Sequence, residues 1–157
     1  MRRARRWSEA RAAIASDDGS ASLEFITVGV LMLVPLVYLV LVVSALQGAS
    51  LGVEGAARQA SRVFVQAETD AAARDAADRA IRVTLADYGI DASDAVVAIS
   101  CRPDPADCLR RRGFVTFELA VVVPLPLAPP ALGLDVPLGV TVHARSTEQV
   151  SRFRAGP

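Results

Sequence analysis

The sequence contains no lysine, one histidine and two cysteines among its 157 residues. Its 17 basic residues, all arginine, balance 17 acidic residues, so no net charge would draw the chain toward nucleic acid. Two cysteines and His143 alone supply fewer side-chain ligands than a protein zinc site needs. We therefore expect neither a nucleic-acid partner nor a metal site.

The sequence also lacks the short motifs that carry common enzyme chemistry. It has no nucleophile elbow, no glycine-rich phosphate loop and no histidine-based dyad. His143 alternates with valines as an exposed strand residue would, and no second carboxylate is recognisably paired with Glu118. Three arginines at 110–112 fit a solvated turn, or a contact to an anionic envelope polymer. We expect no enzyme and no cofactor.

Charge is missing from one long stretch, residues 25–46, where leucine, valine and isoleucine dominate. As a helix, this stretch spans roughly 33 Å, close to the hydrocarbon core of a bilayer. A buried core helix is the alternative, but the rest of the chain is too short to surround it. Arginines at 2, 3, 5, 6 and 11 precede the stretch, which favours a cytoplasmic N-terminus and an extracytoplasmic C-terminal part. The sequence predicts a protein that crosses the plasma membrane once.

A cleaved secretory signal would occupy the same place in the chain. The apolar region of such a signal is shorter than this run, about 7–15 residues, and a cleavage site with small residues follows it. Residues 42–50 offer small residues of that kind. Cutting there would release a soluble domain. The length of the run, with Glu24 at its cytoplasmic end, favours a helix that is retained.

The hydrophobic pattern divides the chain into four segments: a leader (1–19), a membrane helix (20–47), amphipathic helices (48–89) and a small β domain (90–157). Apolar residues spaced by three and four continue the membrane helix to about residue 67, and a second helix runs from a cap at Thr69 or Asp70 to Gly89. The period then becomes two at 96–101, 115–123 and 136–145, which predicts three antiparallel strands. The predicted fold class is α+β. The proline-rich segment 124–135 either covers a sheet edge or touches a membrane or a partner.

Cys101 and Cys108 flank a turn that contains two prolines and two aspartates. Outside the cytoplasm, two cysteines across so short a loop indicate a disulfide. Free thiols and a metal site are the alternatives, and a metal would need further ligands.

The stretch GSASLEF, residues 19–25, stands at the start of the apolar run. In that position it resembles the processing signal of type IV pilin-like proteins. The Glu24–Phe25 pair, the arginine-rich leader, the alanine-rich segment 54–62 and the small C-terminal domain are most similar to the TadE-like family. Its members are minor pilins or pseudopilins of the tight-adherence pilus system. The ending EQVSRFR, residues 148–154, is similar to the tail of actinobacterial members.

The resemblance implies a processing site formed by Gly19, Ser20, Glu24 and Phe25. A prepilin peptidase would cut between Gly19 and Ser20 at the cytoplasmic face and leave the apolar helix on the mature protein. The implied partners are the membrane, that peptidase, other pilin-like subunits and the pilus assembly machinery. The leader departs from the family pattern because it ends in two aspartates, residues 17–18, rather than in basic residues.

The chemistry of Gly19 and Glu24 is consistent with cleavage after Gly19. Glycine has no side chain, so an extended backbone at Gly19 can enter a narrow protease site. We expect Glu24 in the first turn of the mature helix, where a carboxylate favours the helix N-terminus and can pair with the terminal amine of an adjacent subunit. Alternatively, Glu24 stays among lipid headgroups. The competing function is an uncleaved single-pass envelope protein whose outer domain binds a protein or a wall polymer.

Overall fold

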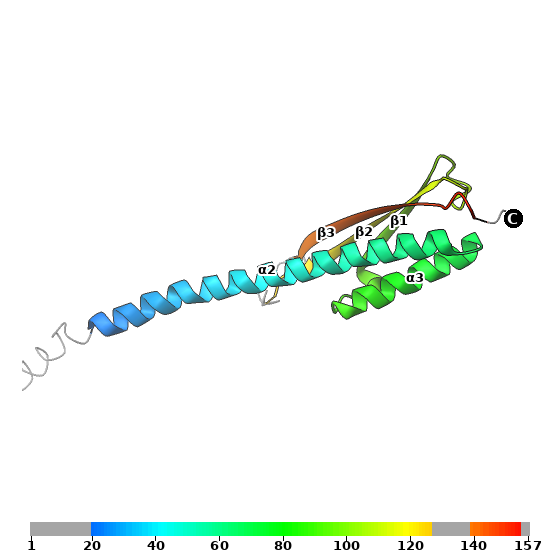
Figure 1. Cartoon of the computed structure of the whole chain (residues 1–157). Coiled ribbons are helices and arrows are strands. Elements are labelled where there is room, and N and C mark those ends of the chain that lie inside the picture. The colour runs from blue at the N-terminus through cyan, green and yellow to red at the C-terminus, as the bar shows by residue number, and fades with distance from the viewer. Residues whose placement is uncertain (1–19, 127–138, 155–157) are drawn as a thin grey trace, which may run out of the picture. The chain divides into compact units, whose positions relative to one another are not determined.

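The computed structural model of the chain describes residues 20–126 and 139–154 (Figure 1). Its elements, in chain order, are α2 (Ser20–Gln66), α3 (Asp70–Asp87), the 3₁₀ turn η2 (Ala92–Asp94), β1 (Ala95–Arg102), β2 (Phe114–Pro124) and β3 (Gly139–Gln149). The predicted α+β class is confirmed, with a long apolar helix, a second helix and a three-stranded antiparallel sheet. The chain divides into two compact units, Met1–Val40 and Leu41–Pro157, and we call the second unit the head.

Helix α2 is 47 residues long and contains Pro35 in its interior. No break separates its apolar part from the amphipathic part that follows Gln47, because the sequence offers no stop signal there. The first turn of α2 holds no acidic residue. The helix begins at Ser20, where the predicted membrane segment begins, and Glu24 follows the first turn, so the expectation of Glu24 within that turn is wrong.

Helix α3 has the boundaries that its capping residues dictate. Thr69 is the N-cap, and its side-chain oxygen accepts a hydrogen bond from the backbone N–H of Ala72 at 3.2 Å. At the other end Gly89 adopts φ +69°, and Ile90 donates its backbone N–H to the carbonyl of Leu85 at 3.0 Å. This left-handed glycine cap reverses the chain after α3.

Small residues let α2 and α3 approach closely within the head. A Cβ atom at Gly52 would meet the Cγ of Tyr88 at 2.8 Å, and one at Gly55 would meet a methyl of Thr84 at 3.4 Å. Ala56 and Ala60 are fully buried on the same helix. Figure 1 shows α3 running beside the C-terminal part of α2, as these contacts require.

The sheet has the order β1-β2-β3, and both neighbouring pairs are antiparallel. Alternate residues of β2 point into the core, as the period of two predicts: Val115, Phe117, Leu119 and Val121 are all buried. The ring of Phe117 meets that of Phe64 on α2 edge to face, with centroids 5.5 Å apart. The hydroxyls of Ser61 and Ser146 also hydrogen-bond at 2.9 Å. Both contacts fix the sheet against α2.

Strand β3 differs from its predicted extent. It runs to Gln149, beyond the expected end at residue 145, because 146–149 continue the pairing with Phe114–Phe117. Residues 136–138 of the expected strand lie outside the described residues, as does most of the proline-rich segment 124–135.

Candidate functional site

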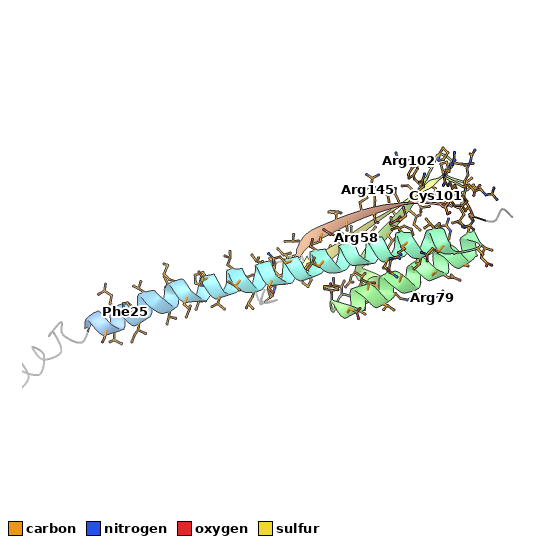
Figure 2. All side chains as sticks on the ribbon, in the orientation of Figure 1. Phe25, Arg58, Arg79, Cys101, Arg102 and Arg145 are labelled. Atoms are coloured by element: carbon orange, nitrogen blue, oxygen red, sulfur yellow. A yellow bond between two sulfur atoms is a disulfide. The ribbon has the colours of Figure 1, made fainter. Side chains whose placement is uncertain are left out.

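The apolar part of α2 presents large side chains that nothing in the described structure covers (Figure 2). Leu23, Phe25, Leu31, Val34 and Leu39 are each more than half exposed. Among the described residues α2 is the one helix long and apolar enough to cross a membrane, and it lies near the N-terminus. An isolated stretch of this length and polarity is typical of a membrane-spanning helix.

The predicted processing residues fall at the start of this helix. Gly19 lies outside the described residues, and Ser20 is the first residue of α2. Glu24 and Phe25 are exposed, and within the described part of the chain Glu24 forms no ion pair. The hydroxyl of Thr27 donates to the carbonyl of Leu23 at 2.7 Å, so this polar group is satisfied within the helix itself. The cleavage remains a prediction.

Cys101 and Cys108 form a disulfide, with Cα atoms 5.1 Å apart. Of the three states left open by the sequence, the structure contains the bonded one. Both cysteines are buried against the core, Cys101 at the end of β1 and Cys108 in the loop before β2. The bond closes the loop that leads to Arg110, Arg111 and Arg112.

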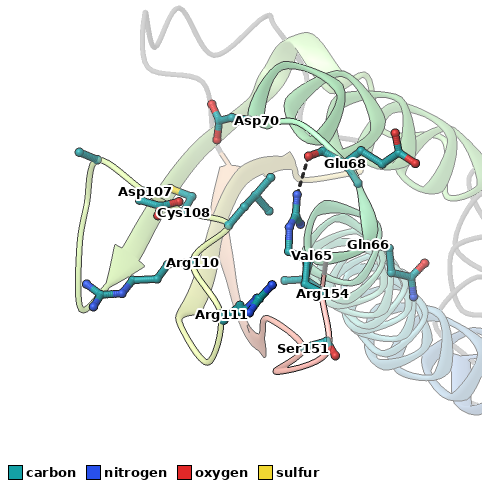
Figure 3. A pocket seen from close by; sticks show the side chains of 13 residues that line it. Val65, Gln66, Glu68, Asp70, Asp107, Cys108, Arg110, Arg111, Ser151 and Arg154 are labelled. Carbon is teal, nitrogen blue, oxygen red and sulfur yellow. Dashed lines mark hydrogen bonds between the residues drawn. The ribbon is translucent and has the colours of Figure 1, made fainter. Parts of the chain in front are cut away.

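A cleft of about 1100 Å³ lies beside this disulfide loop (Figure 3). The residues that line it come from the α2–α3 connection, the disulfide loop and the C-terminal segment, and include Glu68, Asp107, Arg110, Arg111 and Arg154. In Figure 3, Arg111 and Arg154 point toward the end of α2, whereas Arg110 points away from it. We call this feature the arginine cleft.

Within the described part of the chain, the arginines of the cleft form no ion pair with a carboxylate. The ion pairs among the described residues involve Arg58, Arg74, Arg82 and Arg145, none of which belongs to the cleft. Arg154 instead donates to the backbone carbonyl of Glu68 at 2.6 Å, which is a neutral acceptor. The cleft can therefore bind carboxylate or phosphate groups through several guanidinium donors.

Backbone hydrogen bonds hold the arginine-bearing loop in place. Arg112 donates to the carbonyl of Val150 at 3.1 Å, and Val150 donates to the carbonyl of Gly113 at 2.9 Å. Arg112 has φ +61°, an uncommon conformation for a residue with a side chain. A Cβ atom at Gly113 would lie 2.9 Å from the carbonyl oxygen of Arg110, so only glycine fits this turn. These constraints pre-organise the cleft wall.

The outer face of the sheet carries the other residues noted in the sequence. His143 is exposed, as expected for a strand residue. Glu118 lies opposite Arg145 in the register, and their side chains form an ion pair at 3.4 Å. Both side chains are more than half exposed, so the pair contributes at most about 1 kcal/mol.

Acidic residues lie before the first residue of β1, at the end of that strand away from the disulfide loop. Asp87 ends α3, Asp91 is the N-cap of the turn η2, and Asp94 is the last residue of η2, which leads into β1. The pKa of the Asp91 carboxyl is lowered because its carboxylate accepts a hydrogen bond from the backbone N–H of Ser93 and another from the Ser93 hydroxyl. Asp91 is thus firmly ionised at neutral pH.

No group of histidine, cysteine and acidic residues that could hold a metal ion occurs in the described part of the chain. Comparison with models of known protein families, with curated proteins and with solved structures finds no significant match. Function must therefore be argued from the surfaces of the chain itself. Sequence reasoning identified the arginines at 110–112 but missed the cleft, because Glu68 and Arg154 join it from elements far apart in the chain.

Proposed function

We propose that this protein is a pilin-like minor subunit or assembly protein of a tight-adherence, type IV-related pilus. It is inserted in the plasma membrane with its N-terminus in the cytoplasm and cleaved after Gly19 by a prepilin peptidase. The mature protein assembles with other pilin-like subunits through α2, and the head lies outside the cytoplasm.

The observation that carries this proposal is the double role of α2. Its N-terminal part exposes large apolar side chains, and its C-terminal part supplies Val53, Ala56 and Phe64 to the core of the head. One continuous helix thus joins the apolar segment to the core of the head. Exposed leucines and valines of this kind require lipid or the helices of other subunits as cover. During assembly from a membrane, the apolar part of α2 would leave the lipid and pack against the helices of other subunits.

The position of Glu24 supports the same proposal. Its carboxylate lies at the start of the apolar segment and has no ion-pair partner among the described residues. A charge drawn into the bilayer interior costs several kcal/mol unless it is paired. After cleavage, the amino group of Ser20 on a neighbouring subunit would supply that pairing.

The test is co-expression of the full chain with a prepilin peptidase, followed by mass measurement of the membrane-bound product. The wild-type chain should lose residues 1–19, and a Gly19→Val chain should stay intact. Gly29→Val is the matched control, because no atom lies within 4 Å of a Cβ at Gly29, and it should be processed normally. Normal processing of the Gly19→Val chain would overturn the proposal.

A second candidate, the uncleaved envelope protein that binds a protein or wall polymer, is favoured by the arginine cleft. Its guanidinium groups suit an acidic partner. The same mass measurement separates the candidates, since this protein would retain residues 1–19 in the presence of the peptidase.

A further inference from the structure

The charges of the head are segregated toward its two ends. Residues 83–101 contain Asp87, Asp91 and Asp94 and no basic residue. Residues 102–112 and 150–154 together contain six arginines and two aspartates. We call the three aspartates the acidic end and the six arginines the basic end: Arg102, Arg110, Arg111, Arg112, Arg152 and Arg154.

The two ends are too far apart to neutralise each other within one head. Strand β1 joins them, with Asp94 just before its first residue and Arg102 as its last. Its eight residues span about 25 Å, which is roughly three Debye lengths at physiological ionic strength. Neither the three aspartates nor the six arginines form an ion pair among the described residues. Each end therefore keeps charges that form no ion pair with the described residues of the same head.

The basic end is hollowed, whereas the aspartates of the acidic end are exposed. The basic end contains the arginine cleft, which Arg110, Arg111 and Arg154 line and which is held by the disulfide. Glu68, Asp70 and Asp107 also line it, but Asp70 is already paired with Arg74 at 2.7 Å. At the acidic end Asp87, Asp91 and Asp94 are all exposed, on the turn between α3 and β1.

We propose that the basic end of one copy docks on the acidic end of a second copy, so that heads associate head to tail. The partner is the same chain because the acidic end carries no basic residue and the segments of the basic end carry more arginines than aspartates, whereas an anionic lipid surface or polymer would match the basic end alone. A head-to-tail contact uses two different surfaces, leaves one of each open and thus extends into a row of subunits. This inference rests on the proposed assembly role, and it names the contact between heads.

Photochemical cross-linking of the full chain in membranes tests the contact. A photoreactive amino acid replaces Ala86, which is exposed beside Asp87, and the cross-linked peptides are identified by mass spectrometry. We expect a covalent dimer joined to residues 102–112 or 150–154 of a second copy. The yield should fall when NaCl is raised from about 50 mM to about 500 mM, because the attraction is between exposed charges.

Charge reversal then identifies the residues responsible. Arg110→Glu with Arg111→Glu should lower the dimer yield about tenfold, because two attractive contacts become repulsive. A photoreactive copy carrying Asp87→Arg and Asp94→Arg should recover the dimer when mixed with that variant. Neither pair of substitutions removes a hydrogen bond or ion pair formed by the described side chains, and an unchanged melting temperature would verify folding.

The matched control is Arg62→Glu with Arg79→Glu, which changes the net charge equally at exposed arginines of α2 and α3. It should leave the dimer yield unchanged. Equal loss with the control, failure of the mixed copies to recover, or cross-links only to lipid or other proteins would overturn the inference. The cross-link does not require cleavage after Gly19, so its failure and the failure of the proposed processing are distinguishable.

Discussion

The two parts of α2 use apolar residues in opposite ways. In the part that belongs to the first unit, ending at Val40, the side chains from Leu23 onward are exposed, and leucine and valine dominate. In the part within the head, the buried residues are mostly small, namely Gly52, Ala56, Ala57 and Ala60, with Val53 and Phe64 as the larger ones. One continuous helix thus changes from large exposed side chains to mostly small buried ones.

This difference shows that side-chain size, more than apolar character, distinguishes the two environments. Large side chains maximise contact with surrounding lipid or helices. Small ones allow α3 to lie against α2, where a methyl group at Gly52 already collides with Tyr88. Residues of similar hydropathy therefore serve different purposes along the same helix.

The largest expected effect contrasts two phenylalanines of α2. Phe64→Ala should destabilise the head by about 3–5 kcal/mol, because the ring is fully buried against Phe117. Phe25→Ala should leave head stability unchanged, since Phe25 is 80 % exposed. Chemical unfolding of the full chain in detergent micelles, followed by circular dichroism, measures both. Equal losses of unfolding free energy from the two substitutions would contradict the difference between the two parts of α2.

The disulfide should stabilise the head alone. Replacing Cys101 and Cys108 by alanine should cost roughly 2–3 kcal/mol, the value expected for opening so short a loop. The same unfolding experiment gives this loss. Helical content of the apolar part, read at denaturant concentrations that unfold the head, should be the same with and without the disulfide. A change there would contradict the division into two units.

Two glycines of α2 test the difference between its two parts by the addition of a single methyl group. Gly52→Ala should destabilise the head by about 1–3 kcal/mol through the collision with Tyr88. Gly29→Ala has open space around its Cβ and should not destabilise the head. The difference between their unfolding midpoints tests the packing of α2 on α3. No difference would mean that the two helices are not in close contact.

The smallest effect concerns pH and the exposed turn η2. The lowered pKa of Asp91 means that its carboxylate stabilises the folded head above the pKa of the unfolded state, and that this contribution is lost as pH falls through the folded-state pKa. Asp91→Ala should therefore lower the melting temperature slightly at pH 7, with a gap that closes in acid. A gap that widens on acidification would contradict the assignment. The apolar part of α2 provides the contrast, since Phe25→Ala should show no such dependence.

Much of the fold follows from local sequence signals. The apolar run predicts α2, the Thr69 cap and Gly89 bound α3, and alternation predicts which residues of β2 face the core. The arginine cleft and the half-buried Ser61–Ser146 hydrogen bond could not be predicted, because each joins residues about 85 positions apart. The expected first-turn position of Glu24 was wrong, although α2 begins at residue 20, where the membrane helix was predicted to begin.

The most direct test of the central claim is the intact mass of the protein isolated from its own membranes. The claim is that the apolar part of α2 is kept on the mature chain and that residues 1–19 are removed. The account predicts a mass for a chain that begins at Ser20. A chain that begins at Met1, or one that begins near Gln47 and lacks the apolar part of α2, would contradict it.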